Sequence, residues 1–256
     1  MTPFVNHSCA DGVLTIVLDR ADRKNALTDD MCSEISQLLE QAHQSDAARV
    51  ILIRAEGELF SAGADIGEFA AIASGDGPPP ANMRRFQQAF ARATRPIVAA
   101  VQGRAMGIGA TLLLHCDYVV LSEDAQLTTP FVNLAIVPEV ASSRLLPAAI
   151  GHVRAFAMFA LGQPVTASEA LAWGLVNQVV SRAELLPTAQ GVAGRLAAQP
   201  LGALVATKAL MRDAGMIAAQ LEAEQAELLK RLQSDEAREA FSAFAERRTP
   251  NFTRLS

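Results

Sequence analysis

Strand-like and helix-like segments alternate along most of the chain, and this alternation restricts the fold more than any other feature of the sequence. Apolar runs, the pattern of buried strands, occur at 12–20, 48–57, 96–103, 117–123 and 174–180. Helical patterns lie between them at 27–44, with Thr28 as the expected N-cap, and at 82–95 and 109–116. Such alternation is typical of α/β proteins with largely parallel sheets, so we expect an α/β core.

The strand pattern disappears from about residue 183 onward. The stretch 221–248 is long, charged and periodic like a helix. We therefore expect a core over residues 1–195, followed by a C-terminal helical region over 196–256. The apolar positions of that region, Phe241 and Phe244 among them, pack either on the chain's own core or on a neighbouring subunit.

Composition excludes several classes of function. Hydrophobic residues make up 50% of the 256 and charged residues 19%, which is enough apolar material for a sizeable core. A net charge of −5, without a stripe of Lys and Arg, argues against nucleic acid as a partner. No apolar run reaches the roughly 18 residues of a membrane span, and the N-terminus lacks a signal-peptide pattern.

The cysteines and the basic residues narrow the function further. Cys9, Cys32 and Cys116 have no metal-type spacing and cannot all pair, so we expect reduced thiols, a cytoplasmic location and no metal site. Small basic groups, such as the one at 20–24, suit a small molecule that carries phosphate.

Two glycine-containing turns leave their backbone uncovered by large side chains. The first is "LFSAGADI" (59–66), with Gly63 between two alanines, and the second is "VQGRAMGIGATLLL" (101–114), which leads from a strand into a helix. Free N–H groups at a helix start favour an anion or a developing oxyanion. If the turns faced one another, they would form an oxyanion hole for a thioester enolate. Either turn alone can equally be a tight strand-to-helix connection.

The combination of four motifs resembles the crotonase superfamily, also called the enoyl-CoA hydratase/isomerase family. The motifs are "DRADRKNAL", "LFSAGADI", "RPIVAAVQGRAMGIGATLLLHCDYVVLSEDAQL" and "FSAFAERRTPNF", and the resemblance covers nearly the whole chain. It implies a spiral of ββα units that carries the acyl-CoA site. It also implies a C-terminal helical region that builds a homotrimer, commonly paired into a hexamer (a dimer of trimers).

The same resemblance implies the binding residues. The oxyanion-hole N–H groups fall on Ala64 and on Ile108, where the family usually has Gly, so that the isoleucine narrows the acyl pocket. Coenzyme A, which is part of the substrate rather than a separate cofactor, is expected along Arg23, Lys24, Ala62, Asp65 and Ile66. From the tail, Phe244 and Arg247 match positions that reach coenzyme A, with Arg where Lys is frequent.

The family's hydratases use two glutamates, and this chain has neither. The matching positions carry Thr111 and Phe131, and neither a neutral hydroxyl nor a phenyl ring can act as a general base. Simple addition of water is therefore not expected.

Glu139 remains as the candidate base. The stretch "TPFVNLAIVPE" resembles Δ3,Δ2-enoyl-CoA isomerases, in which a Pro-Glu at this place supplies the base. Ring-forming epoxyphenylacetyl-CoA isomerases and some hydrolases of the family carry Asp there. An apolar setting would raise the carboxylate's pKa. The alternative is a plain helix start, with Pro138 in the first turn and Glu139 complementing the helix dipole.

Other polar residues have simpler interpretations. His115 is expected to be packed or capping rather than a metal ligand, because no second His-rich segment exists. Ser142 and Ser143 lack a His partner for a triad and are expected to pack or hydrogen-bond within their helix. Asp65 also suits the cap of the next short helix, and Asp124 suits a turn.

The sequence therefore predicts an acyl-CoA isomerase of fatty acid metabolism that moves a proton from C2 to C4 of a 3-enoyl thioester. Three alternatives stay open: a hydratase (a lyase), another crotonase reaction such as hydrolysis or ring isomerisation, and a non-catalytic acyl-CoA-binding homologue. The loop 73–81 and the helix after it are expected to line the acyl end.

Overall fold

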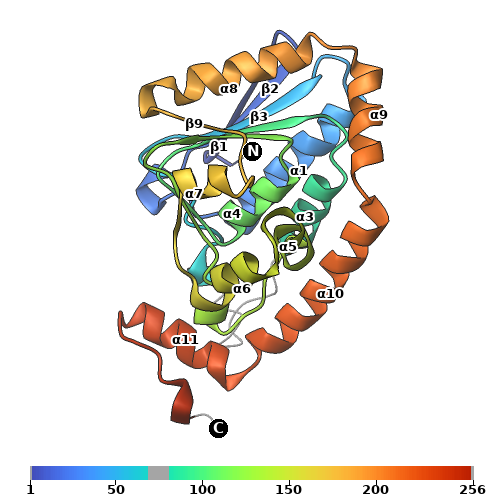
Figure 1. The fold of residues 1–256 in the computed structure, drawn as a ribbon. Helices are drawn as coiled ribbons and strands as arrows, with labels where there is room; N and C mark the ends of the chain where they lie inside the picture. The colour runs from blue at the N-terminus through green and yellow to red at the C-terminus, as the bar shows by residue number, and fades with distance from the viewer. Residues whose placement is uncertain (1, 69–80, 255–256) are drawn as a thin grey trace.

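A six-stranded sheet forms the centre of the computed structural model, which describes residues 2–68 and 81–254 (Figure 1). Its strands, in spatial order, are β1 (Val5–Ala10), β2 (Val13–Leu18), β3 (Val50–Ala55), β4 (Ile97–Val101), β6 (Tyr118–Ser122) and β9 (Gln178–Val180). Only β1 runs antiparallel to its neighbour, and the pairs from β2 to β9 are parallel. The expected α/β architecture with a largely parallel sheet is confirmed.

Both faces of this sheet are covered, as the continuous apolar runs predict. In β3, Ile51 and Ile53 point into the main core cluster beneath α1 (Asp29–Gln44) and α3 (Met83–Ala91). The alternate residues Val50 and Leu52 pack against α8 (Arg182–Ala197) on the opposite face.

A second, three-stranded sheet stands beside the first and was not predicted. It contains β5 (Arg104–Met106), β7 (Gln126–Thr128) and β8 (Val165–Thr166), in that order. A single parallel bridge between Ser61 and Ala105 joins β5 to the first glycine turn. This sheet therefore fixes the second glycine turn, which follows β5, next to the first.

The helices agree with the sequence in part. Thr28 caps α1 as expected, because its Oγ1 accepts a hydrogen bond from the N–H of Met31 (3.3 Å). The single helix expected over 109–116 is instead one α-helical turn, α4 (Ile108–Thr111), followed by the 3₁₀ segment η2 (Leu112–His115). Downstream lie α5 (Ser142–Ile150), α6 (His152–Leu161) and α7 (Ala167–Ala172).

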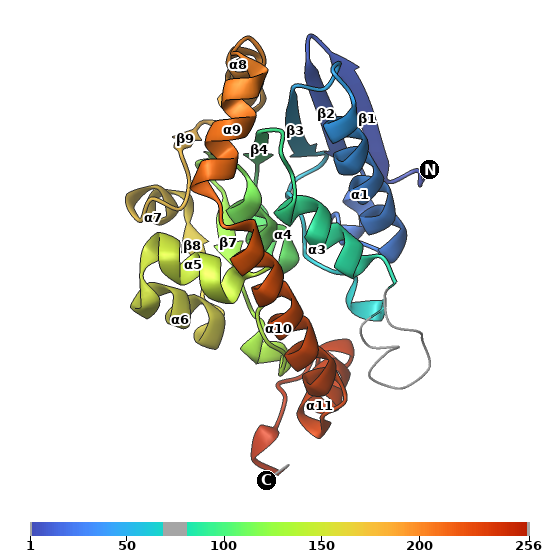
Figure 2. The same cartoon turned by 90° about the vertical axis from the view of Figure 1, so that its right-hand side faces the viewer.

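The C-terminal helices form an arm that runs down one side of the core and ends below it (Figures 1 and 2). They are α9 (Leu201–Met211), α10 (Ala214–Leu232) and α11 (Asp235–Ala245). The continuous helix expected over 221–248 is broken, because Ser234 accepts a hydrogen bond from the N–H of Ala237 and starts a new helix. The boundary proposed between residues 195 and 196 falls in the last turn of α8 and stays a prediction.

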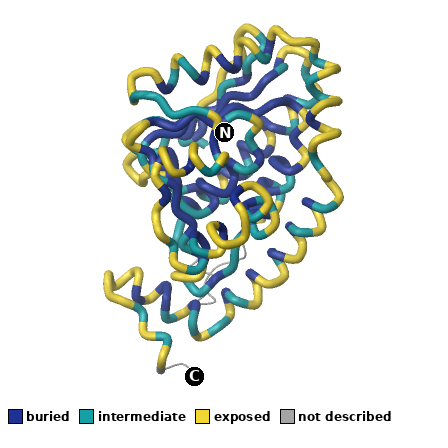
Figure 3. The backbone as a smooth tube through the Cα atoms, viewed as in Figure 1, coloured by how far each residue is buried: buried dark blue, intermediate teal, exposed yellow. Residues whose placement is uncertain are grey.

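Much of the arm is exposed along its outer side (Figure 3). Within the part of the chain that the structure describes, no helix is long and apolar enough to cross a bilayer.

Candidate active site

A cavity of about 320 Å³ lies where the two glycine turns, the segment before α5 and helix α11 meet. Its described lining is Ala62, Gly63, Ala64, Ile66, Met106, Gly107, Ile108, Pro130, Phe131, Asn133, Leu134, Ile136, Glu139, Ala240, Phe241, Phe244, Arg248 and Pro250. The walls are mostly apolar, and Glu139 is the only acid among these described residues. A larger cavity of about 600 Å³ lies between α9, α10 and the core, but none of the glycines of the two turns lines it.

The two glycine turns touch each other. A Cβ on Gly63 would lie 2.8 Å from the carbonyl oxygen of Met106 and 3.7 Å from the Cα of Gly107, so only glycine permits this approach. Gly63 also has a φ of +93°, a conformation that side chains disfavour. The hydrogen bond from the N–H of Met106 to the carbonyl of Ser61 (2.9 Å) fixes the same contact.

The amides of Ala64 and Ile108 are free to bind an oxyanion. Both residues line the cavity, and neither N–H donates a hydrogen bond to any residue that the structure describes. Ile108 is the first residue of α4, so its N–H has no partner within the helix. Two unpaired donors beside one apolar cavity are the arrangement that stabilises an enolate oxygen.

Glu139 is buried at the wall of the cavity, with 5% of its surface exposed. Its Oε2 accepts a hydrogen bond from Nε2 of Gln87, on α3, at 3.0 Å. Burial raises the pKa of Glu139 to about 8, and the Glu224 carboxylate adds to this while the Gln87 hydrogen bond opposes it. A carboxylate in such a setting is a stronger base than one in water.

The interpretation of Glu139 as a plain helix start is wrong. Helix α5 begins only at Ser142, after Val140 and Ala141, which both adopt left-handed backbone conformations (φ +64° and +56°). A β-branched residue there costs on the order of 1–3 kcal/mol, so surrounding contacts must hold it. The kink directs the Glu139 side chain into the protein instead of along the helix.

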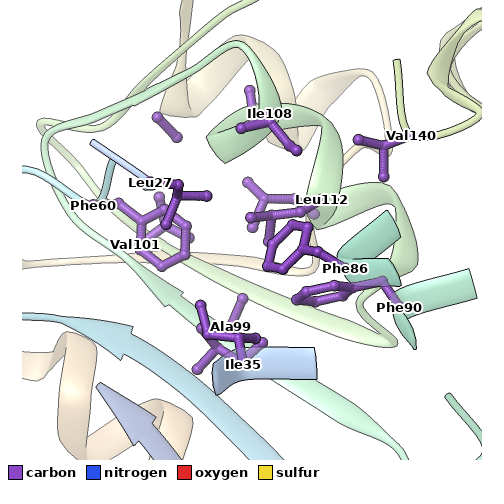
Figure 4. Close-up of a cluster of buried hydrophobic side chains, with 14 of the residues drawn as sticks. Leu27, Ile35, Phe60, Phe86, Phe90, Ala99, Val101, Ile108, Leu112 and Val140 are labelled. Carbon is purple, nitrogen blue, oxygen red and sulfur yellow. The ribbon is translucent and has the colours of Figure 1, made fainter. Parts of the chain in front are cut away.

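Two polar side chains hold the kinked backbone. Nε2 of His115 is 2.8 Å from the carbonyl oxygen of Val140. Glu224, on α10, accepts hydrogen bonds from the N–H groups of Ala141 (2.6 Å) and Ser143 (2.9 Å) and from the Ser143 hydroxyl. Val140 itself is completely buried in the cluster that Figure 4 shows.

The residues predicted to bind coenzyme A are divided by the structure: Ala62, Ile66 and Phe244 line the cavity, whereas Arg23, Lys24, Asp65 and Arg247 do not. The segment that carries Arg23 and Lys24 runs beside the first turn, where the N–H of Ala62 donates to the carbonyl of Lys24 (2.9 Å). Both basic side chains are exposed, whereas Ala62 and Ile66 line the cavity.

Asp65 lies in the same loop and has structural partners. Its Oδ2 accepts from Arg20 at 2.7 Å, and its Oδ1 accepts from the N–H of Gly67 at 3.0 Å. The second hydrogen bond fits the expected capping role. The loop 73–81 falls outside the described residues except for its last residue.

Of the two residues predicted from the tail, Phe244 lines the cavity but Arg247 does not. Its neighbour Arg248 lines the cavity instead. Phe244 lines the cavity and is 54% exposed. Arg248 also lines it, although its guanidinium is already paired with Glu239 (2.6 Å) and Glu246 (2.5 Å). Arg247 is exposed outside the lining and makes no ion pair with a described residue.

The two positions that carry glutamates in hydratases differ in their surroundings. Phe131 lines the cavity and is almost completely buried. Thr111 is buried outside the lining, and its hydroxyl donates back to the carbonyl of Gly107 (3.3 Å). Neither position offers a proton acceptor to the cavity.

His115 is packed and bonded to Val140, as the sequence predicts. Residues 2–68 and 81–254 contain no His, Cys, Asp or Glu cluster that could hold a metal. Asp124 lies in a turn and pairs with Arg182. Ser143, however, bonds to Glu224 on α10 rather than within its own helix.

Comparisons with known proteins agree with this geometry. Residues 8–254 match the model of the family described as enoyl-CoA hydratase/isomerase. The chain belongs to this family. It is 32% identical over 260 residues to the 1,2-epoxyphenylacetyl-CoA isomerase of Escherichia coli (strain K12), which covers 99% of each protein. It is 33% identical over 246 residues to the 2,3-dehydroadipyl-CoA hydratase of the same organism, with 94% of each covered.

The enoyl-CoA hydratase/isomerase fold is also confirmed by a solved structure. The crystal structure of a family member from Pseudoalteromonas atlantica T6c has a TM-score of 0.91 and 34% identity, covering 97% of this chain and 99% of that one. The chain is thus an acyl-CoA-processing enzyme of the crotonase superfamily.

Gln87 and Glu224 support the site and were not predicted. Gln87 is buried on an otherwise apolar face of α3, and a polar residue at such a position was a signal in the sequence. Glu224 had no such signal, because it lies among other glutamates in a charged helix.

Proposed function

We propose that this enzyme is a Δ3,Δ2-enoyl-CoA isomerase in which Glu139 moves a proton from C2 to C4 of the acyl chain. The observation that carries the proposal is the buried Glu139 carboxylate, the only acid among the described residues of the cavity wall. The reaction needs one group that both removes and returns a proton, and a second acid is unnecessary.

The proton balance fits a single carboxyl group. Ionised Glu139 takes a proton from C2 of the 3-enoyl thioester, and the electron pair moves onto the carbonyl oxygen to give an enolate. The same carboxyl then returns the proton at C4, two bonds away, while the C2–C3 double bond forms and the carbonyl is restored. A base with a pKa of about 8 is well matched to this transfer near neutral pH.

The free amides of Ala64 and Ile108 would hold the enolate oxygen between the two steps. Because they are fixed donors in an apolar cavity, they stabilise the charge without reorganising. The walls that Phe131 and Phe241 provide keep water away from the conjugated product.

The size of the cavity decides which part of the substrate enters it. About 320 Å³ suits an acyl group with its thioester but not a whole coenzyme A. The nucleotide therefore lies outside, along the exposed Arg23 and Lys24, where Arg247 is a further partner for phosphate.

The direct test is the conversion of 3-hexenoyl-CoA to the conjugated 2-enoyl product, followed by the thioester's rise in absorbance. We expect Glu139→Gln to lower kcat by about 10³-fold with a small change in KM, because the amide cannot accept the proton. In the unchanged enzyme kcat/KM should rise with pH around a midpoint near 8, as Glu139 ionises.

The matched control is Glu222→Gln, at an exposed carboxylate on α10, which should leave kcat within twofold of the original. Retention of full turnover by Glu139→Gln would end the proposal. Rapid loss of crotonyl-CoA absorbance in water would instead favour a hydratase, and tight acyl-CoA binding without turnover would favour a non-catalytic homologue.

Ring isomerisation is a second candidate, and one observation favours it. The relative from E. coli that matches the chain over 99% of its length is named 1,2-epoxyphenylacetyl-CoA isomerase. Three phenylalanines, Phe131, Phe241 and Phe244, line the cavity and would accept an aromatic acyl group. Comparing kcat/KM for the epoxide with that for 3-hexenoyl-CoA decides between the two reactions.

The assembly, location and pathway stay predictions. A homotrimer or hexamer, a cytoplasmic location and a role in fatty acid metabolism follow from the resemblance and from cysteine use. Sedimentation of the purified protein tests the first.

A further inference from the structure

We propose that His115 is a positioning residue that orients Glu139. Arg212 fixes the tautomer of His115 by a hydrogen bond, and His115 in turn binds the carbonyl of Val140. This inference rests on the proposed function, because it concerns the same carboxylate. It gives the C-terminal helical region a direct part in arranging the catalytic base.

The hydrogen-bond partners of His115 fix which ring nitrogen carries the proton. Nη2 of Arg212 lies 2.7 Å from Nδ1 of His115, and Nη1 of Arg212 donates to the His115 carbonyl (3.2 Å). A guanidinium can only donate, so Nδ1 must be the acceptor. The ring proton is therefore on Nε2, which donates to the carbonyl of Val140 at 2.8 Å.

The held carbonyl belongs to the residue directly after Glu139. Val140 has a φ of +64°, which an isolated chain would leave at once for an ordinary conformation. The single peptide group that joins Val140 to Ala141 is held at both of its polar atoms: His115 binds the Val140 carbonyl, and Glu224 binds the N–H of Ala141. Without the His115 hydrogen bond, only Glu224 would hold this peptide group, which could then tilt and move the Glu139 side chain with it.

The surroundings keep this device in one charge state. His115 is completely buried, and its pKa is lowered to about 3 by burial and by the positive charges of Arg212 and Lys208. The imidazole therefore stays neutral across the working pH range. Among the described residues, the charged or titratable groups that interact with Glu139 are Glu224 on α10 and Cys32 on α1, beside the uncharged Gln87 on α3. Arg248, which is paired with Glu239 and Glu246, lines the same cavity.

Two variants of His115 separate its hydrogen bond from its bulk. His115→Leu keeps an apolar side chain of similar size but has no donor. His115→Gln keeps an N–H at nearly the same distance from the backbone and an oxygen that can accept from Arg212. The matched control is Lys208→Met, which removes another buried polar link between α9 and the core, the pair with Asp117 (2.6 Å), without touching Val140.

The first measurement is the pH dependence of kcat/KM, which a merely structural loss would not move. In His115→Leu we expect kcat at pH 9 to fall by about 10- to 100-fold with little change in KM, because the base is misplaced. The midpoint at which kcat/KM rises with pH (the acid limb of the profile) should also fall by about one pH unit or more, because water then reaches Glu139 and lowers its pKa. His115→Gln should stay within about threefold in kcat, and Lys208→Met should lower Tm without moving the limb.

The second measurement does not depend on activity. The carboxyl carbon of Glu139, assigned by the signal lost in Glu139→Gln, is titrated by ¹³C NMR in each variant. If Glu139→Gln keeps turnover, the proposed function fails, while the titration still reports whether His115 controls the carboxylate.

An unchanged Glu139 titration in His115→Leu would overturn the inference, as would an equal shift in Lys208→Met or a failure of His115→Gln to restore the original. Should His115→Leu not fold, Arg212→Met leaves the imidazole in place and removes the hydrogen bond from Arg212 to its Nδ1. In Arg212→Met, the ¹⁵N shifts of His115 should show that the ring proton is no longer confined to Nε2, and the midpoint of the acid limb should fall. An unchanged tautomer together with an unchanged midpoint would equally overturn the inference.

Discussion

Glu139 is the residue at which the energetics of folding and the proposed chemistry oppose each other. Its carboxylate is buried at the wall of an apolar cavity, and the Glu224 carboxylate, which raises its pKa further, carries the same charge. The ionised form that would remove a proton is therefore the form that the folded protein disfavours.

This opposition predicts a pH-dependent gain in stability for Glu139→Gln. The folded pKa of about 8 lies above the ordinary 4.5, so the folded state keeps a proton that the unfolded state loses. The stability due to that proton is complete below about pH 4.5 and is lost as pH rises through 8. At pH 9 we expect the variant to be more stable by on the order of 3–5 kcal/mol, from about 1.4 kcal/mol per pKa unit.

Urea unfolding at pH 5 and pH 9 measures the effect, and Glu222→Gln serves as the exposed control. A gain for Glu139→Gln of the same size at both pH values would contradict the raised pKa.

At the scale of elements, the contact between the two glycine turns predicts a sharp difference between two Gly→Ala variants. In Gly63→Ala the new Cβ would lie 2.8 Å from the carbonyl oxygen of Met106, and the alanine would have to keep a φ of +93°. The two turns must therefore separate. We expect kcat to fall by about 100-fold or more, since separation removes one oxyanion donor.

The matched variant is Gly191→Ala, in the interior of α8, where a Cβ would meet nothing within 4 Å. It should gain up to about 1 kcal/mol in unfolding free energy from helix propensity, at unchanged kcat. Steady-state kinetics of both variants check the pair, and a Gly63→Ala enzyme with normal kcat would show that the contact is dispensable.

Most of the long elements could be predicted from the sequence, and most of the short ones could not. Apolar runs such as 48–57 identify β3, but the two or three residues of β5, β7 and β8 are too few to carry a periodicity. β1 was missed because all but one of its residues are exposed. The break at Ser234 did have a signal, a serine followed by Asp235 and Glu236, which is typical of a helix start.

The candidate site divides in the same way. The family motifs predicted Ala64, Ile108 and Glu139, and the structure brings all three to one cavity. The supports of Glu139 come from helices far away in the sequence, and no local pattern links Glu224 or His115 to residue 139. Only tertiary contacts reveal them.

For the whole molecule, the important feature is that the last helix, α11, closes the cavity. Phe241 is buried, lines the cavity and also belongs to the main core cluster. Phe241→Ala should therefore raise KM about tenfold or more and lower stability by about 3–5 kcal/mol, because it opens the acyl pocket and leaves a void.

Phe156→Ala is the control, because this phenylalanine lies on α6 with 62% of its surface exposed. We expect its KM to stay within twofold. Equal KM values for the two variants, measured with 3-hexenoyl-CoA, would mean that α11 does not bound the acyl site.

The kink at Val140 has a consequence for the order in which the protein is made. Ribosomes synthesise Glu139 well before Arg212, which lies between α9 and α10, and Glu224, which lies on α10. The final conformation at Val140 depends on both of these side chains. A partly made chain would thus carry the acid but not its supports. The active site would become complete only late in biosynthesis, after α9 and α10 have left the ribosome and packed onto the core.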